Sequence, residues 1–78
     1  MFEIVKKILL KQLTDVSEDK ITMEANIVED LGADSLSVMQ IIMDLEEEFQ
    51  LDVDDADVNG LRTVGDIVRY CEQKVNKK

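Results

Sequence analysis

The motif Asp34-Ser35-Leu36 is the part of the sequence best suited to chemistry, because it opens a long amphipathic segment. A serine on the first turn of a helix is exposed beside unpaired backbone N–H groups and the positive end of the helix dipole. These groups favour a phosphate attached at that position. Asp and Ser are also preferred helix caps, so a purely structural role for Asp34 or Ser35 is the alternative.

A second set of residues has the spacing of a calcium-binding loop. The EF-hand pattern, with Asp in place of the final Glu, is followed by Asp55, Asp57, Asn59, Gly60 and Asp66. Arg62 stands where that pattern normally has an apolar residue, and Asp is a poorer bidentate ligand than Glu. A single EF-hand-like module over Asp55–Asp66 is therefore the weaker hypothesis, and we expect no dedicated metal site.

The composition excludes several classes of active site. The chain has no histidine and one cysteine, so neither a zinc site nor a Ser-His or Cys-His pair can be built. The spacing of Cys71 from Val64, Ile67 and Val68 places it on an apolar stripe, where a buried structural residue is expected. We therefore expect none of these catalytic sites.

The charge distribution is strongly one-sided. The net charge is −9, and the span from Ile21 to Leu61 has no Lys or Arg but twelve of the eighteen acidic residues. Nucleic acid is an unsuitable partner, because phosphate binding needs clustered basic residues. An acidic face instead attracts proteins with basic patches.

Apolar periodicity predicts the elements that position these residues. At 78 residues we expect one domain over 1–78, forming an all-α bundle of three main helices and one short helix. The first helix begins near Phe2, a long loop follows to Ala33, the second helix spans about 35–50, and the last begins after Thr63. Ile21, Met23, Ile27, Val28 and Leu31 are expected to anchor the long loop.

The second helix has two apolar stripes. The broad one should face the core and consists of Val38, Ile41, Ile42, Leu45 and Phe49. Leu36, Met39 and Met43 form a narrower strip edged with acids, which suits docking of several partners. Lysines interrupt the apolar pattern of the first helix, so we expect neither a signal peptide nor membrane insertion. A monomer in the reducing cytoplasm is the resulting expectation.

Three blocks of sequence resemble the acyl carrier proteins of dissociated fatty-acid synthesis. They are Val28 to Leu36, Leu45 to Phe49, and Thr63 to Asp66 with Tyr70. The likeness covers nearly the whole chain without gaps. It implies that a separate phosphopantetheinyl transferase attaches 4′-phosphopantetheine to Ser35. The arm's thiol would then hold acyl chains as thioesters while the protein visits the enzymes of fatty-acid synthesis. The resemblance thus implies a carrier and substrate of other enzymes, with no active site of its own.

The resemblance also implies two groups of site residues. The residues expected to dock basic partner enzymes are Asp34, Leu36, Met39, Met43, Glu46, Glu47 and Asp55. The residues expected to line an acyl pocket are Ile27, Val28, Ile41, Ile42, Leu45, Val53, Leu61, Ile67 and Cys71. Ordinary core packing predicts the same residue types at the pocket positions.

The chain departs from the family pattern on the second helix. Ser37 and Gln40 replace common acids, whereas Asp44 replaces a common small residue, so the acidic face shifts toward the helix C-terminus. These departures leave the choice of partner enzymes open, though not the modification. A carrier of the same fold that serves polyketide, peptide or alanyl transfer is the nearest alternative.

Overall fold

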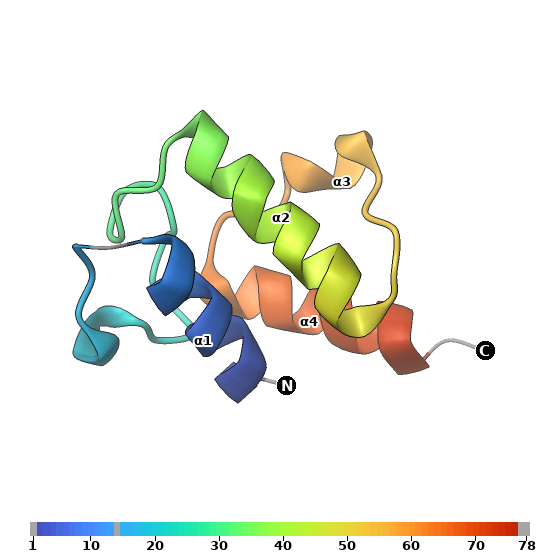
Figure 1. Ribbon diagram of the computed structural model, residues 1–78, viewed down its shortest axis with the longest axis horizontal. Helices are drawn as coiled ribbons and strands as arrows, with labels where there is room; N and C mark the ends of the chain where they lie inside the picture. Colours follow the sequence, from blue (N-terminus) through green and yellow to red (C-terminus); the bar gives the residue numbers. More distant parts are fainter. Residues whose placement is uncertain (1, 14, 77–78) are drawn as a thin grey trace.

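The computed structural model describes residues 2–13 and 15–76, and within them the chain is helical, with no strands (Figure 1). Three main helices and one short helix confirm the predicted all-α architecture, and a single 3₁₀ turn interrupts the long first loop. The elements are α1 (Phe2–Gln12), η1 (Glu18–Lys20), α2 (Ser35–Phe49), α3 (Asp55–Val58) and α4 (Val64–Asn76).

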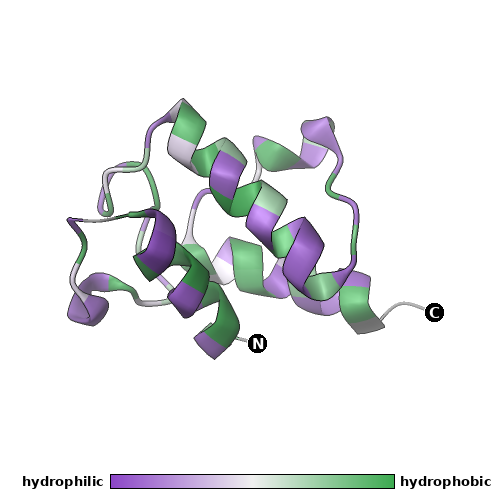
Figure 2. Cartoon of the chain, in the orientation of Figure 1, coloured by the Kyte–Doolittle hydropathy of each residue, from purple (hydrophilic) through white to green (hydrophobic). Residues whose placement is uncertain are grey.

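The core lies where α1, α2 and α4 pack against one another. Apolar side chains recur at helical spacing on one face of each helix, and burying each stabilises the fold by roughly 1.5–3 kcal/mol. The fully buried larger side chains are Leu9, Ile27, Ile41, Leu45, Ile67, Val5, Val64 and Cys71. Each helix also carries hydrophilic residues along its length (Figure 2). The position of Val75, four residues after Cys71, predicts that it also faces inward. This prediction is wrong, because Val75 is exposed on the last turns of α4.

The long loop is held to the start of α4 by backbone hydrogen bonds. Ile27 donates its N–H to the carbonyl of Arg62 at 2.9 Å, and Gly65 donates to the carbonyl of Met23 at 2.8 Å. A Cβ on Gly65 would lie 2.9 Å from that carbonyl oxygen, so the close approach requires glycine. Ile21, Ile27 and Leu31 are buried anchors as expected, whereas Met23 and Val28 are exposed.

The loop makes a left-handed turn at Gly32 just before α2 begins. Gly32 has φ +78°, in the left-handed region that favours glycine. The next residue, Ala33, is buried and donates its N–H to the carbonyl of Ile27 at 2.9 Å. The turn therefore fixes the chain immediately before Asp34 and Ser35.

A capping box formed by Thr63 and Asp66 starts α4. The Asp66 N–H donates to the Thr63 hydroxyl at 3.1 Å, and the Thr63 N–H donates to the Asp66 carboxylate at 3.2 Å. The Thr63 backbone hydrogen bond is the main reason that the pKa of Asp66 lies below its usual value. Arg69 also pairs with Asp66 at 2.9 Å.

Replacing Asp66 with alanine should lower the free energy of unfolding by about 1 kcal/mol at neutral pH, since a cap is lost. The folded carboxyl stays ionised below the unfolded pKa of about 3.9, so its contribution is complete above that pH and disappears as the pH falls through the lowered folded pKa. Urea unfolding measured across this pH range should show that the difference in free energy of unfolding between wild type and D66A decreases as the pH falls. Glu72→Ala, at an exposed acid on the same helix, is the matched control.

The short helix α3 is held by polar links from both neighbouring helices. The carboxylate of Glu46 on α2 accepts the N–H of Val53 at 2.9 Å, just before α3. The Tyr70 hydroxyl on α4 donates to the carboxylate of Asp57 at 2.9 Å. None of the four residues of α3 is buried, so this helix is attached to the bundle without being part of its core.

A search of the described helices for a membrane span found none that is long and apolar enough.

Candidate functional site

Ser35 is the first residue of α2, and its side chain is exposed. The cap is Asp34, whose carboxylate accepts the Ser37 N–H at 2.8 Å. This backbone hydrogen bond is the main cause of the lowered pKa of Asp34. Because Asp34 caps the helix, the Ser35 hydroxyl is not needed for that role. It stands at the positive end of the helix dipole, where an attached phosphate is favoured.

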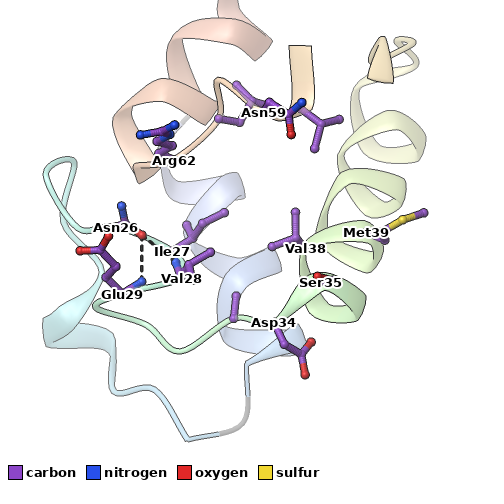
Figure 3. Close-up of a pocket in the computed structure, with 13 residues that line it drawn as sticks. Asn26, Ile27, Val28, Glu29, Asp34, Ser35, Val38, Met39, Asn59 and Arg62 are labelled. Carbon is purple, nitrogen blue, oxygen red and sulfur yellow. Dashed lines mark hydrogen bonds between the residues drawn. The ribbon is translucent and has the colours of Figure 1, made fainter. Parts of the chain in front are cut away.

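An open groove of about 740 Å³ begins at Ser35, and we call it the Ser35 groove. Its buried floor is formed by Ile27, Ala33 and Leu61. Figure 3 shows side chains of the loop, of α2 and of the segment after α3 around the same space. The remaining lining residues are Asn26, Val28, Glu29, Asp34, Val38, Met39, Val58, Asn59 and Arg62.

The strip of Leu36, Met39 and Met43 lies along α2 from Ser35. These side chains are 68%, 61% and 60% exposed, so this strip is open to solvent as predicted. Of the acids expected to dock partners, Asp34, Glu47 and Asp55 are exposed. An apolar strip edged by carboxylates suits a partner with apolar anchors and a basic rim.

Two acids of α2 have structural partners. Glu46, expected to dock partners, is half-buried and uses its carboxylate to hold the Val53 N–H. Asp44 faces α1, where its carboxylate accepts the side-chain amide of Gln12 at 2.6 Å and pairs with Lys11 at 3.8 Å. Asp44 therefore links α1 to α2. Among the expected docking acids on α2, Glu47 is the exposed one near the C-terminal end of the apolar strip.

The residues expected to line an acyl pocket lie in three places. Those within the core, 8% exposed or less, are Ile41, Ile42, Leu45, Ile67 and Cys71. Ile27 and Leu61 form the floor of the Ser35 groove, and Val28, 53% exposed, lies on its rim. Val53 is half-buried and shares with Ile42 a smaller cleft of about 230 Å³ between α2 and α3.

Sequence reasoning missed the polar part of the Ser35 groove. Asn26, Asn59 and Arg62 come from segments without helical periodicity, so no pattern indicated that they lie opposite the start of α2. Asn26 shapes the loop, since its side-chain oxygen accepts the N–H groups of Val28 and Glu29 at 2.9 and 2.8 Å (Figure 3).

The structure does not support the calcium-loop hypothesis, because the acids of the motif lie on different elements and some have other partners. Asp55 and Asp57 lie on α3, Asp57 accepts the Tyr70 hydroxyl, and Asp66 belongs to the capping box of α4. Among the described residues, no group of three or more His, Cys, Asp or Glu side chains could hold a metal ion. In this structure the residues with the EF-hand spacing are therefore not arranged as a calcium-binding loop.

Cys71 is a core residue, as its spacing indicated. Burial raises the pKa of its thiol to about 11, so the thiol stays protonated near neutral pH. Because the thiolate is the reactive form, burial and the raised pKa both disfavour a catalytic role for Cys71.

Comparisons with known proteins show the family to which the chain belongs. Residues 4–71 match a family model described as a phosphopantetheine attachment site, which defines the class of domain. An acyl carrier protein of Clostridium perfringens is 46% identical over 77 residues, covering 99% of this chain and 100% of that protein. An acyl carrier protein of Thermotoga maritima is 48% identical over 75 residues, covering 96% of this chain and 91% of that protein.

The chain belongs to the acyl carrier protein family. It is a non-catalytic carrier with a phosphopantetheine attachment site, and the resemblance seen in its sequence is confirmed.

Proposed function

We propose that Ser35 bears 4′-phosphopantetheine through a phosphodiester and that residues 1–78 form one carrier domain for fatty-acid synthesis. The observation that carries this proposal is the exposed Ser35 hydroxyl on the first turn of α2, with capping already supplied by Asp34. When bound, the arm supplies a thiol that holds acyl groups as thioesters.

The surroundings of Ser35 fit the attached group. The side chain opens to solvent, so a transferase can reach its oxygen, and the helix N-terminus lowers the free energy of a phosphate there. The adjacent Asp34 carboxylate accepts the Ser37 N–H, and this hydrogen bond partly offsets the repulsion between the carboxylate and a nearby phosphate. The chain's own contribution is thus to present one hydroxyl and to stabilise the charge added to it.

We place the acyl chain against the apolar interior between α2, α3 and α4. The supporting observation is continuity: Ile42 belongs to the core and also lines the α2–α3 cleft, while Leu61 is the floor of the Ser35 groove. An acyl chain entering there would meet Ile41, Leu45, Ile67 and Cys71 behind these residues. Apolar surroundings free of buried unpaired polar side chains, among the residues described, suit a hydrocarbon guest.

Partners are proposed to be the phosphopantetheinyl transferase and fatty-acid synthesis enzymes with basic patches. The net charge of −9 and the acids beside the methionine-rich strip support encounters steered by charge, with rapid release. The same charge opposes self-association, so we propose a monomer. The single buried thiol suits the reducing cytoplasm.

Reversing the charge at Glu47 should slow loading by the transferase. We expect E47K to lower kcat/KM by up to about tenfold at low salt, because electrostatic steering of a basic partner is weakened. The difference should shrink near 1 M salt, where the Debye length is about 3 Å. Glu72→Lys, an equal charge change at an exposed site on α4, is the control. Equal slowing by both variants would point to net charge alone and not to this surface.

Loading of the wild-type chain tests the proposed function. The protein is incubated with a phosphopantetheinyl transferase and coenzyme A, and its intact mass is followed, with fragmentation to locate the modification. Addition of one arm at Ser35, followed by formation of fatty acyl thioesters with an acyl-loading enzyme, supports the proposal. Loading that succeeds only with amino acids or polyketide starter units would assign the carrier to another pathway.

A further inference from the structure

We propose that Met39 and Met43 form a reversible oxidation site, at which a hydroperoxide converts their thioethers to sulfoxides and thereby weakens the docking of partner enzymes. The inference rests on the proposed docking role of the strip of Leu36, Met39 and Met43. It goes further by assigning a covalent modification to two side chains of that strip, with a consequence for loading at Ser35.

The two thioethers are open to a small oxidant dissolved in water. Met39 is 61% exposed and Met43 is 60% exposed, although methionine is among the residues most often buried. They stand four residues apart on α2, so they lie on one face of the helix. Figure 3 shows the Met39 side chain extending outward from α2. Both side chains also line the cleft between α2 and α3, so oxidation would make that cleft more polar as well.

The other sulfur atoms that the structure describes are less suited to this reaction. Cys71 is 1% exposed, and burial raises the pKa of its thiol to about 11, so little thiolate is present to react. Met23 is 37% exposed and lies on the long loop, where its carbonyl accepts the Gly65 N–H. A mild oxidant should therefore modify Met39 and Met43 before either of these residues.

The reaction is a two-electron oxidation of sulfur that needs no catalytic group from the protein. A lone pair of the thioether sulfur attacks one oxygen of the hydroperoxide, and an S–O bond forms as the O–O bond breaks. The sulfur is oxidised and the peroxide is reduced. The proton on the attacked oxygen moves to the departing oxygen, which leaves as water or as an alcohol. Methionine sulfoxide reductases, one for each sulfoxide epimer, reverse the change.

Oxidation makes an apolar anchor polar without changing its charge. The sulfoxide oxygen is a hydrogen-bond acceptor that loses its water when an apolar partner surface covers it. Docking should therefore weaken where the two surfaces come into contact. The acids beside the strip, including Glu47 and Asp55, are unchanged, so the long-range attraction of a basic partner is retained. The loss should thus persist at high salt, in contrast to the loss expected for E47K.

Loading of the arm-free protein by a phosphopantetheinyl transferase tests this site, because without the arm no second exposed thiol can be oxidised. The protein is treated with hydrogen peroxide, catalase removes the excess, and fragmentation in the mass spectrometer locates each added oxygen. We expect sulfoxides at Met39 and Met43 and a fall in kcat/KM of at least about fivefold, since polar groups must be buried without partners. The fall should persist near 1 M salt, and sulfoxide reductases with a dithiol should reverse it.

A variant in which leucine replaces both residues is the matched control. Leucine has a similar volume and no sulfur, so M39L/M43L should load about as fast as untreated wild type and should not respond to peroxide. This variant keeps Met1, Met23 and Cys71. A peroxide effect that survives in it would therefore overturn the assignment to the strip. Circular dichroism of oxidised wild type should show unchanged helix content, because both modified side chains are exposed.

The outcomes distinguish this inference from the proposed function. If sulfoxides at Met39 and Met43 leave kcat/KM unchanged, or if they do not form, the oxidation site is overturned and the carrier function stands. Slower loading that accompanies a loss of helix content would also overturn it, because the effect would then be unfolding. If even the untreated protein accepts no arm at Ser35, both proposals are overturned together.

Discussion

Ser35→Ala is expected to abolish addition of the phosphopantetheine arm completely. The serine oxygen is the atom that would form the bond to phosphorus, and alanine has no atom to replace it. The chain has only two other serines, Ser17 and Ser37, and neither is the first residue of α2. Intact mass after incubation with transferase and coenzyme A measures the result directly. The loss should be all or none, in contrast to the partial effects expected at the docking surface.

Ser37→Ala is the matched control for this experiment. It removes a hydroxyl two residues away, but the Ser37 N–H that bonds Asp34 belongs to the backbone and is retained. Loading should therefore proceed, and circular dichroism should show unchanged helix content in both variants. An arm found on S35A protein would contradict the assignment of the attachment residue.

Leu45→Ala should destabilise the fold more than the loss of the α4 cap or of any exposed side chain on α2. Leu45 is 1% exposed in the core beneath the middle of α2, so truncation removes apolar contacts and leaves a cavity. Such substitutions cost about 2–5 kcal/mol. Domains of this size have a total stability of only about 5–15 kcal/mol, and each kcal/mol shifts Tm by roughly 4–8 °C. We therefore expect a fall in Tm of about 10 °C or more in a thermal melt.

Met43→Ala provides the comparison on the same helix. Met43 is 60% exposed, so its truncation should change stability by about 0.5 kcal/mol or less. In an assay of partner docking, under conditions where both variants are folded, we expect the opposite ranking. Met43→Ala should lose more binding than Leu45→Ala. Similar melting temperatures for the two would show that α2 does not bury the face assigned to it.

Much of the fold could be predicted from the sequence because it depends on local rules. The apolar period of α2 identifies Ile41, Ile42 and Leu45 as core, and cap chemistry places Asp34 and Thr63 at helix starts. These signals act over three or four residues. They also position Ser35, since the first turn of a helix follows directly from its cap.

The groove and the side-chain partners of the acids could not be predicted in the same way. The pairing of Ile27 with Arg62 joins segments far apart in the chain, and neither segment has a repeating pattern. Glu46 and Glu47 are equivalent acids in the sequence. Only the return of the chain after α2 gives Glu46 the Val53 N–H as a partner and leaves Glu47 exposed. The expectation that Val28 is a buried anchor of the loop was wrong, because the loop has no repeating pattern that shows which of its apolar residues face the core.

If the acyl chain lies where we propose, between α2, α3 and α4, the attachment of α3 sets how readily this space can enlarge. The links Glu46–Val53 and Tyr70–Asp57 are two hydrogen bonds, each contributing about 0.5–1.5 kcal/mol. A displaced arrangement costing a few kcal/mol is populated at roughly 0.1–10%. Displacement of α3 alone would thus enlarge the space for longer acyl chains, while α1, α2 and α4 keep their mutual packing.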